Sequence, residues 1–198
     1  MVKFRCLMEG LCCKKYWIPV THLDLYRLHL YGSIEVERLY RYTDLYPSKD
    51  MGDAKFTSIR FCGEDFYLAL KSTEDGCIFL SRDGKCSVHG FKPLVCRFYP
   101  FVYIAREDGE ILVDVNDRAI EECPGLQIDD NTIPYEIESS IKQLARARLK
   151  EIELWNRVAA EFSKMYGDRC DKKYLIRFLI QKAQEDYLRL REEGLWIT

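Results

Sequence analysis

The sequence lacks a strong net charge, a long apolar run and a recognisable export signal. Its formal net charge is only −2, which gives no long-range attraction for nucleic acid or anionic lipid. No apolar run approaches the roughly 18 to 20 residues that span a bilayer, and the N-terminal stretch MVKFRCLMEG lacks the apolar core of a signal peptide. We therefore expect no nucleic-acid partner, no membrane association and a cytoplasmic location.

Several common site motifs are missing as well. No G-x-G-x-x-G follows a predicted strand, which argues against a Rossmann-type nucleotide site. The C-x3-C-x2-C signature of radical enzymes is absent, and no two cysteines have the C-x2-C spacing of a zinc ribbon. Nine cysteines are nevertheless present, so they need another explanation.

The chain is long enough to fold without cross-links. It has 198 residues, of which 47% are hydrophobic and 31% charged, a balance typical of a globular domain with a normal core. Cytosolic reductants would keep most of its cysteines as thiols, so metal binding is the leading explanation for them. Disulfides are an alternative if the source is a thermophile, because intracellular proteins of such organisms are an exception to that rule.

Hydrophobic periodicity predicts an α+β fold. It indicates short helices over residues 18–32 and 33–46, hairpins over 55–71 and 101–115, a short strand over 77–80, a long helix from Pro134 to Met165, and a final helix ending at Gly194. We expect a cysteine-cluster domain of short helices and small β-hairpins over residues 1–132. A long antiparallel helical pair should follow as a second domain over residues 133–198.

Seven of the nine cysteines fall into three groups beside turn-forming residues. The groups are Cys6, Cys12 and Cys13; Cys77, Cys86 and Cys96; and Cys123. A thiolate is a soft donor, so the pattern indicates zinc or an iron–sulfur cluster and not a hard cation. The adjacent side chains of Cys12 and Cys13 diverge, which suits two irons of one cluster or two separate centres. Cys62 and Cys170 lack such surroundings, and we expect them to be small apolar core residues.

The stretches CLMEGLCC, GCIFLSRDGKCSVHGFKPLVCRFYPF and ECPG resemble the YkgJ-type cysteine-cluster family, which is marked by an N-terminal CxxCxxCC and described as a zinc- or iron-chelating domain. The resemblance covers about residues 4 to 126 and extends distantly to the cluster region of flagellin lysine-N-methylases. It implies that the seven grouped cysteines chelate the metal, and it favours a [4Fe–4S] cluster over zinc. Glu9 departs from the family pattern, because it stands where the second cysteine of CxxCxxCC would be. We expect it to be exposed, since soft centres prefer sulfur.

Three further observations concern the surroundings of the metal. A four-iron cluster takes four thiolates, so seven cysteines leave either thiols that do not touch the metal or a second metal centre. Arg97 follows Cys96, and we expect it to be a cofactor-binding residue that donates hydrogen bonds to sulfur, a structural salt bridge being its alternative role. His89 is either a further ligand or a turn residue with solvent access.

The sequence therefore predicts a metal-binding protein whose iron–sulfur cluster has a structural or redox role. One alternative is a zinc-binding protein of the same family. Another, which the family resemblance implies, is a cluster-containing protein lysine methyltransferase that uses S-adenosylmethionine. The third is an interaction module that binds a protein partner or protein substrate through its C-terminal helices, an idea that Trp196 near the end of the chain supports.

Overall fold

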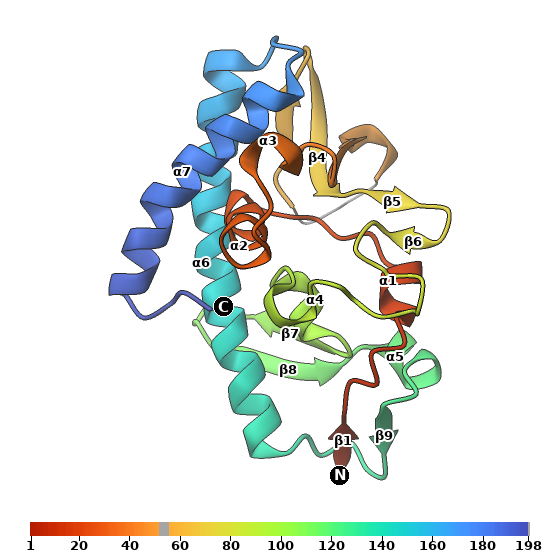
Figure 1. Cartoon of the computed structure of the whole chain (residues 1–198). Helices are drawn as coiled ribbons and strands as arrows, with labels where there is room; N and C mark the ends of the chain where they lie inside the picture. Colours follow the sequence, from red (N-terminus) through yellow and green to blue (C-terminus); the bar gives the residue numbers. More distant parts are fainter. Residues whose placement is uncertain (52–55, 198) are drawn as a thin grey trace.

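The computed structural model describes residues 1–51 and 56–197 and has the predicted α+β fold (Figure 1). The longest helix, α6 (Tyr135–Tyr166), runs along one side of the molecule, and α7 (Lys172–Glu192) lies beside it in the opposite direction. The shorter α-helices are α1 (Leu11–Lys15), α2 (His22–Gly32), α3 (Val36–Leu39), α4 (Val95–Phe98) and α5 (Asp117–Glu122). Across the described ranges, no helix combines the length and the apolar character that a membrane span needs.

The strands form small antiparallel sheets. Their pairs are β2 (Thr43–Pro47) and β3 (Ile59–Phe61) on either side of β4 (Glu64–Leu70), β1 (Val2–Phe4) with β9 (Leu126–Ile128), β5 (Ser72–Thr73) with β6 (Gly76–Cys77), and β7 (Phe101–Ala105) with β8 (Ile111–Val115). The pairing of β1 with β9 joins distant parts of the chain. It brings Cys6, which follows β1, near Cys123, which precedes β9.

The positions of α2, α6 and α7 confirm the predictions from periodicity. At the start of α2, Thr21 and Asp24 form a capping box, in which each side chain accepts the backbone N–H of the other residue. Pro134 precedes α6, and its fixed φ suits entry into a helix. The carboxylate of Asp171 caps α7 by accepting the N–H of Tyr174.

The prediction of a helix over residues 33–46 is wrong beyond Leu39. Only Val36–Leu39 are α-helical, and Thr43–Pro47 form β2 instead. The reason is tertiary, because β2 pairs along its whole length with β4, a partner that local periodicity cannot reveal. The predicted strand over residues 77–80 is also too long, since β6 ends at Cys77. Both predicted hairpins are present, although Lys55 lies outside the described residues.

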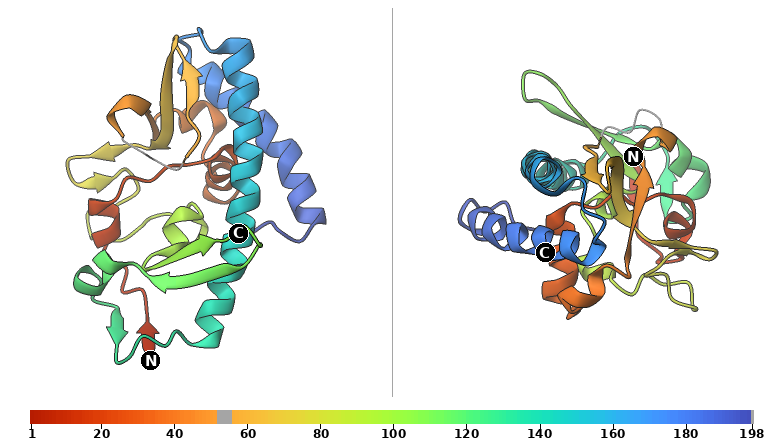
Figure 2. Two further views of the ribbon diagram at one scale, coloured as in Figure 1. Left: turned by 180° about the vertical axis from the view of Figure 1, so that it is seen from behind. Right: turned by 90° about the horizontal axis from the view of Figure 1, so that it is seen from above.

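Two hydrophobic cores lie along α6. The larger core packs α2, β3, β4 and α7 against the C-terminal half of α6. The smaller core packs β1, α4, β7 and β8 against its N-terminal half. Each core contains side chains from both predicted domains, residues 1–132 and residues 133–198. Seen from behind and from above, α1, α5 and the β5–β6 hairpin lie on the side of the molecule away from α6 and α7 (Figure 2).

The C-terminal tail packs against the body of the protein. The ring of Trp196 stacks on the guanidinium of Arg27 at 4.1 Å, and its Nε1 donates a hydrogen bond to the hydroxyl of Tyr31 at 2.9 Å. The carbonyl of Ile197 accepts a hydrogen bond from Arg27 Nε at 2.7 Å. Trp196 thus makes contacts within the chain, and the docking role of the C-terminal helices stays a prediction.

Cys62 and Cys170 are not the buried core residues that the sequence predicted. Both are exposed, and they form a disulfide with a Cα–Cα distance of 4.5 Å. The disulfide joins the β3–β4 turn to the α6–α7 turn, where the N–H groups of Cys62 and Gly63 also donate to the carbonyls of Arg169 and Gly167. Single-sequence reasoning missed this pair because 108 positions separate the two residues.

Removal of this disulfide should destabilise the protein. The double variant Cys62→Ser, Cys170→Ser frees a loop closed over 108 positions, and the usual cost of losing a native disulfide is roughly 2–5 kcal/mol. Urea unfolding of the variant and the wild type without reductant measures this difference in free energy. Wild-type protein unfolded with a reductant should match the variant. Equal stability of the oxidised wild type and the variant would contradict the prediction.

Candidate metal centre

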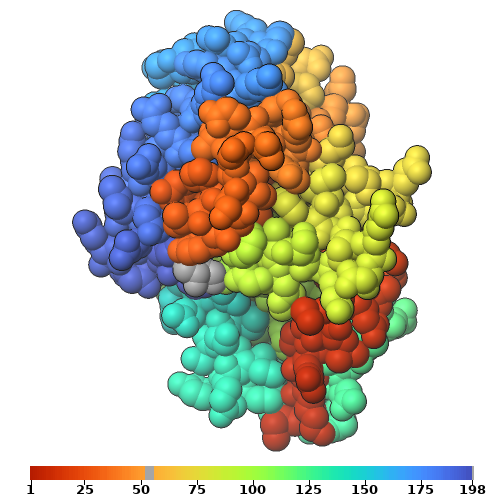
Figure 3. All heavy atoms as spheres, in the orientation of Figure 1, coloured from red at the N-terminus to blue at the C-terminus, as the bar shows by residue number. Residues whose placement is uncertain are grey.

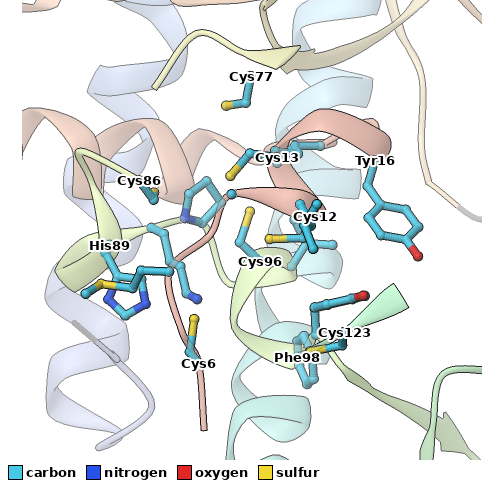
Figure 4. A pocket seen from close by; sticks show the side chains of 18 of the residues that line it. Cys6, Cys12, Cys13, Tyr16, Cys77, Cys86, His89, Cys96, Phe98 and Cys123 are labelled. Atoms are coloured by element: carbon cyan, nitrogen blue, oxygen red, sulfur yellow. The ribbon is translucent and has the colours of Figure 1, made fainter. Parts of the chain in front are cut away.

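All seven grouped cysteines line one cavity of about 380 Å³ (Figure 4). Different elements supply them, since Cys12 and Cys13 lie on α1, Cys77 on β6 and Cys96 on α4. The other three lie outside these elements. Cys6 follows β1, Cys86 forms an isolated β-bridge with Leu80, and Cys123 is the C-cap residue of α5. Figure 4 shows several of the sulfur atoms pointing into the common space. The structure therefore brings together every residue that the sequence predicted as a metal ligand.

The cavity lies where the two hydrophobic cores meet. Its lining includes Phe79 and Val88 from the larger core and Phe98 and Phe101 from the smaller one. Apolar and aromatic walls of this kind exclude water and lower the local dielectric constant, which strengthens any interaction between thiolates and a cation. The α4 helix crosses between the cores, because Phe98 belongs to the smaller core while Cys96 packs against the larger one.

Glycines allow the cysteine-bearing segments to approach one another. Gly10 has a φ of +67°, and a Cβ built there would lie 2.5 Å from the carbonyl oxygen of Gly84 in the second segment. A Cβ at Gly125 in the third segment would lie 2.0 Å from the carbonyl oxygen of Arg5 in the first. Neither oxygen belongs to a flexible side chain, so any larger residue would push two cysteine-bearing segments apart. Figure 3 shows the first segment lying against the second at the surface.

Hydrogen bonds between thiols favour ionisation of two of them. Cys13 is hydrogen-bonded to both Cys12 and Cys86. These bonds, aided by the positive charge of Lys92, lower the pKa of Cys12 to about 6 and that of Cys86 to about 7. The same bonds raise the pKa of Cys13. The thiolate is the form of cysteine that binds metal, and these shifts favour that form of Cys12 and Cys86 near neutral pH.

Lys92 is a positively charged residue whose electrostatic effect reaches several of the thiols. It lines the cavity, and its charge acts on Cys12, Cys86 and Cys96. Burial raises the pKa of Cys96, and it does the same for Cys77 and Cys123. A bound cation would offset that cost, since a metal deprotonates a coordinating thiol. Sequence reasoning gave Lys92 no role at the centre.

The described residues contain no ready-made site for a single metal ion. Within residues 1–51 and 56–197, no three His, Cys, Asp or Glu side chains are gathered closely enough to hold one ion. A zinc ion draws four thiolates to about 2.3 Å from a common point. The seven thiols are instead distributed over the walls of the cavity. This donor set is soft throughout and suits zinc or an iron–sulfur centre.

The other predicted site residues differ in their placement. His89 lines the cavity, and its Nε2 is buried with no hydrogen-bond partner among the described residues. Burial, followed by the charge of Lys92, lowers the pKa of His89, which favours the neutral form of its ring. Glu9 also lines the cavity and is exposed, as expected. Arg97 does not line it, and its Nε donates to the carbonyl of Lys92 at 3.1 Å.

Trp17 is a lining residue that sequence reasoning missed. Its Nε1 is buried and has no hydrogen-bond partner in the described part of the chain. An indole N–H can only donate, so an acceptor inside the cavity would satisfy it. The only available signal was its position four residues after Cys13, which does not distinguish a donor from an ordinary core aromatic.

A buried network of charged side chains holds in place the α4 helix, which carries Cys96. Asp24 accepts hydrogen bonds from Arg148 at 3.0 Å and from the N–H of Leu94 at 2.9 Å. Arg27 pairs with Glu151 and with Asp24. All four charged side chains are at least 95% buried. Leu94 is the N-cap residue of α4, so the carboxylate of Asp24 fixes the helix that carries Cys96.

The charge of Asp24 persists in this position because of its partners. Burial opposes ionisation, but Arg148 and Arg27 hold the pKa of Asp24 below its usual value. A buried ion pair contributes little net stability, but loss of one partner leaves an uncompensated charge. The network therefore fixes the position of α4 at a site where a small displacement would move a thiol.

Comparison with known protein families agrees with this geometry. A family model named CxxCxxCC, described as "Putative zinc- or iron-chelating domain", matches residues 5–124. That range contains all seven cysteines that line the cavity. No curated protein and no solved structure matches the chain significantly.

Substitution of Gly125 should separate the first and third cysteine segments. The Cβ of Gly125→Ala would meet the Arg5 carbonyl, so we expect Cys6 and Cys123 to move apart and overpacking to cost about 1–3 kcal/mol. Metal analysis and urea unfolding measure the two effects. Gly90→Ala is the matched control, because nothing lies within 4 Å of its Cβ position. Retention of full metal content and stability by Gly125→Ala would contradict this account.

Neutralisation of Asp24 should destabilise the protein strongly. Asp24→Asn removes the ion-pair partner of the buried guanidinium of Arg148, at an expected cost of about 3–5 kcal/mol. The control is Asp129→Asn, which breaks an exposed pair with Lys3 and should leave the free energy of unfolding nearly unchanged. Chemical denaturation of both variants measures the difference. Similar effects of the two substitutions would show that the buried network does not restrain α4.

Proposed function

The chain belongs to the CxxCxxCC family of metal-chelating domains, and from this premise we propose that it carries a cysteine-ligated [4Fe–4S] cluster. The observation that carries the proposal is the convergence of seven thiols, from segments up to 117 positions apart (Cys6 to Cys123), on one cavity. Four thiolates suffice for such a cluster. The residues that would hold it are drawn from these seven cysteines.

The chemistry of the lining supports iron–sulfur over zinc. The metal-facing donors are thiols, and two of them have pKa values near neutrality. No three are gathered for one ion in the described ranges, whereas a cluster several atoms wide binds thiolates that lie farther apart. The N–H of Trp17 suits a sulfide acceptor, since N–H groups commonly hydrogen-bond to cluster sulfur.

The chain's own residues define the environment of the cluster. Lys92 offsets part of the negative charge that several thiolates create. Phe98 and Phe101 exclude water from the inner wall, and Asp24 holds α4 in place through Leu94. When bound, an iron–sulfur cluster supplies one-electron transfer or organises the fold around it. Both roles are consistent with a centre at the junction of two cores.

Anaerobic purification followed by metal, sulfide and absorption analysis tests the proposal. We expect iron and acid-labile sulfide in similar amounts, together with a broad visible absorption shoulder. The variant Cys62→Ser, Cys170→Ser should retain both, because its cysteines do not line the cavity. A colourless protein that binds only zinc, even after incubation with iron and sulfide, would overturn the proposal.

A further inference from the structure

His89 brings a ring nitrogen to the wall of the cysteine cavity. The residue lines the cavity, and its Nε2 is buried without a hydrogen-bond partner in the parts of the chain that the structure describes. A buried polar atom without a partner is rare in proteins, because nothing compensates for the water that it has lost. Neutral imidazole is also among the commonest metal ligands. A cavity lined by seven thiols therefore has a nitrogen donor in its wall as well.

The backbone brings His89 close to one of these thiols. His89 follows Cys86 by three positions, and its N–H donates a hydrogen bond to the carbonyl of Cys86 at 3.3 Å. This turn leads into the 3₁₀ segment η2 (His89–Phe91), and side chains three positions apart in such a turn face the same way. Ligand pairs with so short a spacing are typical of metal sites built on one turn. Figure 4 shows both residues in the lining of the cavity.

Packing on either side holds the backbone of His89 in place. Val88 belongs to the larger core and is 5% exposed, and its carbonyl accepts the N–H of Phe91 at 3.0 Å. The ring of Phe91 lies against Gly32 at the end of α2, where an added Cβ would lie 2.8 Å from it. A side chain on a backbone restrained in this way is positioned before a metal binds, as a ligand should be.

The segment that carries His89 lies against the segment with one cysteine fewer. Glu9 stands where the second cysteine of the CxxCxxCC pattern would be, and it is exposed. An added Cβ at Gly84 would lie 3.9 Å from the carbonyl oxygen of Glu9. Gly84 precedes Cys86 by two positions. The segment that lacks a thiol and the segment that adds an imidazole are therefore in contact.

We propose that Nε2 of His89 is a ligand of the metal centre, bound together with Cys86 and other thiolates of the cavity. The inference goes beyond the proposed function, in which cysteines supply the ligands, and it rests on that function only in requiring a metal in the cavity. Zinc sites and iron–sulfur clusters both accept imidazole in place of a thiolate. An imidazole ligand is neutral, so a cluster that it binds is less negative and is reduced more readily.

Spectroscopy detects a metal-bound nitrogen directly. After anaerobic reconstitution with iron and sulfide, the reduced wild type should show in pulsed electron paramagnetic resonance the strong nitrogen hyperfine coupling of a bound imidazole. His89→Ala should lose this coupling. The matched control is His29→Gln, which should keep it, because His29 lies outside the cavity and bonds to the carbonyl of Ile34. A wild type without this coupling, or a His89→Ala variant that retains it, would overturn the inference.

His89→Cys decides the question if His89→Ala fails to fold or to bind iron. Its thiolate should keep the iron in place, remove the nitrogen coupling and lower the reduction potential of the centre relative to the wild type. Circular dichroism shows whether each variant retains the fold. A reduction potential equal to that of the wild type, or an unchanged nitrogen coupling, would show that His89 is not a ligand.

X-ray absorption separates this inference from the proposed function. If the centre binds zinc, ring scattering from an imidazole in the wild type and its loss in His89→Ala would support the inference, although the proposed function would fail. If iron is bound by sulfur alone, the inference fails and the proposed function stands. A wild type that binds neither metal would overturn both.

Discussion

Close backbone contact between three distant segments is the constraint on which the metal centre depends. Seven thiols reach one cavity only because the segment of Cys6 packs against the segments of Cys86 and Cys123 without intervening side chains. The antiparallel pair of β1 and β9 fixes one of these contacts, and the approach of Gly10 to Gly84 fixes the other. A thiol cannot compensate for a displaced backbone, because its side chain has one rotatable bond.

The helical half of the protein serves this centre indirectly. The α6 helix supports both cores, and its Arg148 and Glu151 complete the buried charge network around Asp24. That network ends on the N–H of Leu94, at the start of the helix that carries Cys96. The C-terminal tail adds to this network, because the carbonyl of Ile197 accepts a hydrogen bond from Arg27 and the ring of Trp196 stacks on its guanidinium. Residues far from the cavity in sequence therefore contribute to the position of a thiol.

Chemistry at the cavity follows from what lines it. Soft donors, a nearby lysine and apolar walls suit the chelation of zinc or iron. The inner wall is closed by the junction of the two cores, whereas the loop of Leu7 and Met8 is exposed. The cavity therefore has one side that is closed by packed side chains and another side that solvent can reach.

The sequence alone determined the fold class, the main helices and the seven cysteines, because periodicity, caps and residue chemistry are local properties. Thr21 and Asp24 mark the start of α2, and the spacing of apolar residues after Pro134 marks α6. Only the tertiary structure decided what depends on distant partners. Residues 43–47 form a strand because they pair with β4, and Cys62 forms a disulfide with Cys170 because the fold brings the two residues together. The fold also placed Trp17 in the cavity and Arg97 outside its lining. These outcomes depend on contacts between residues far apart in the chain, which no local pattern encodes.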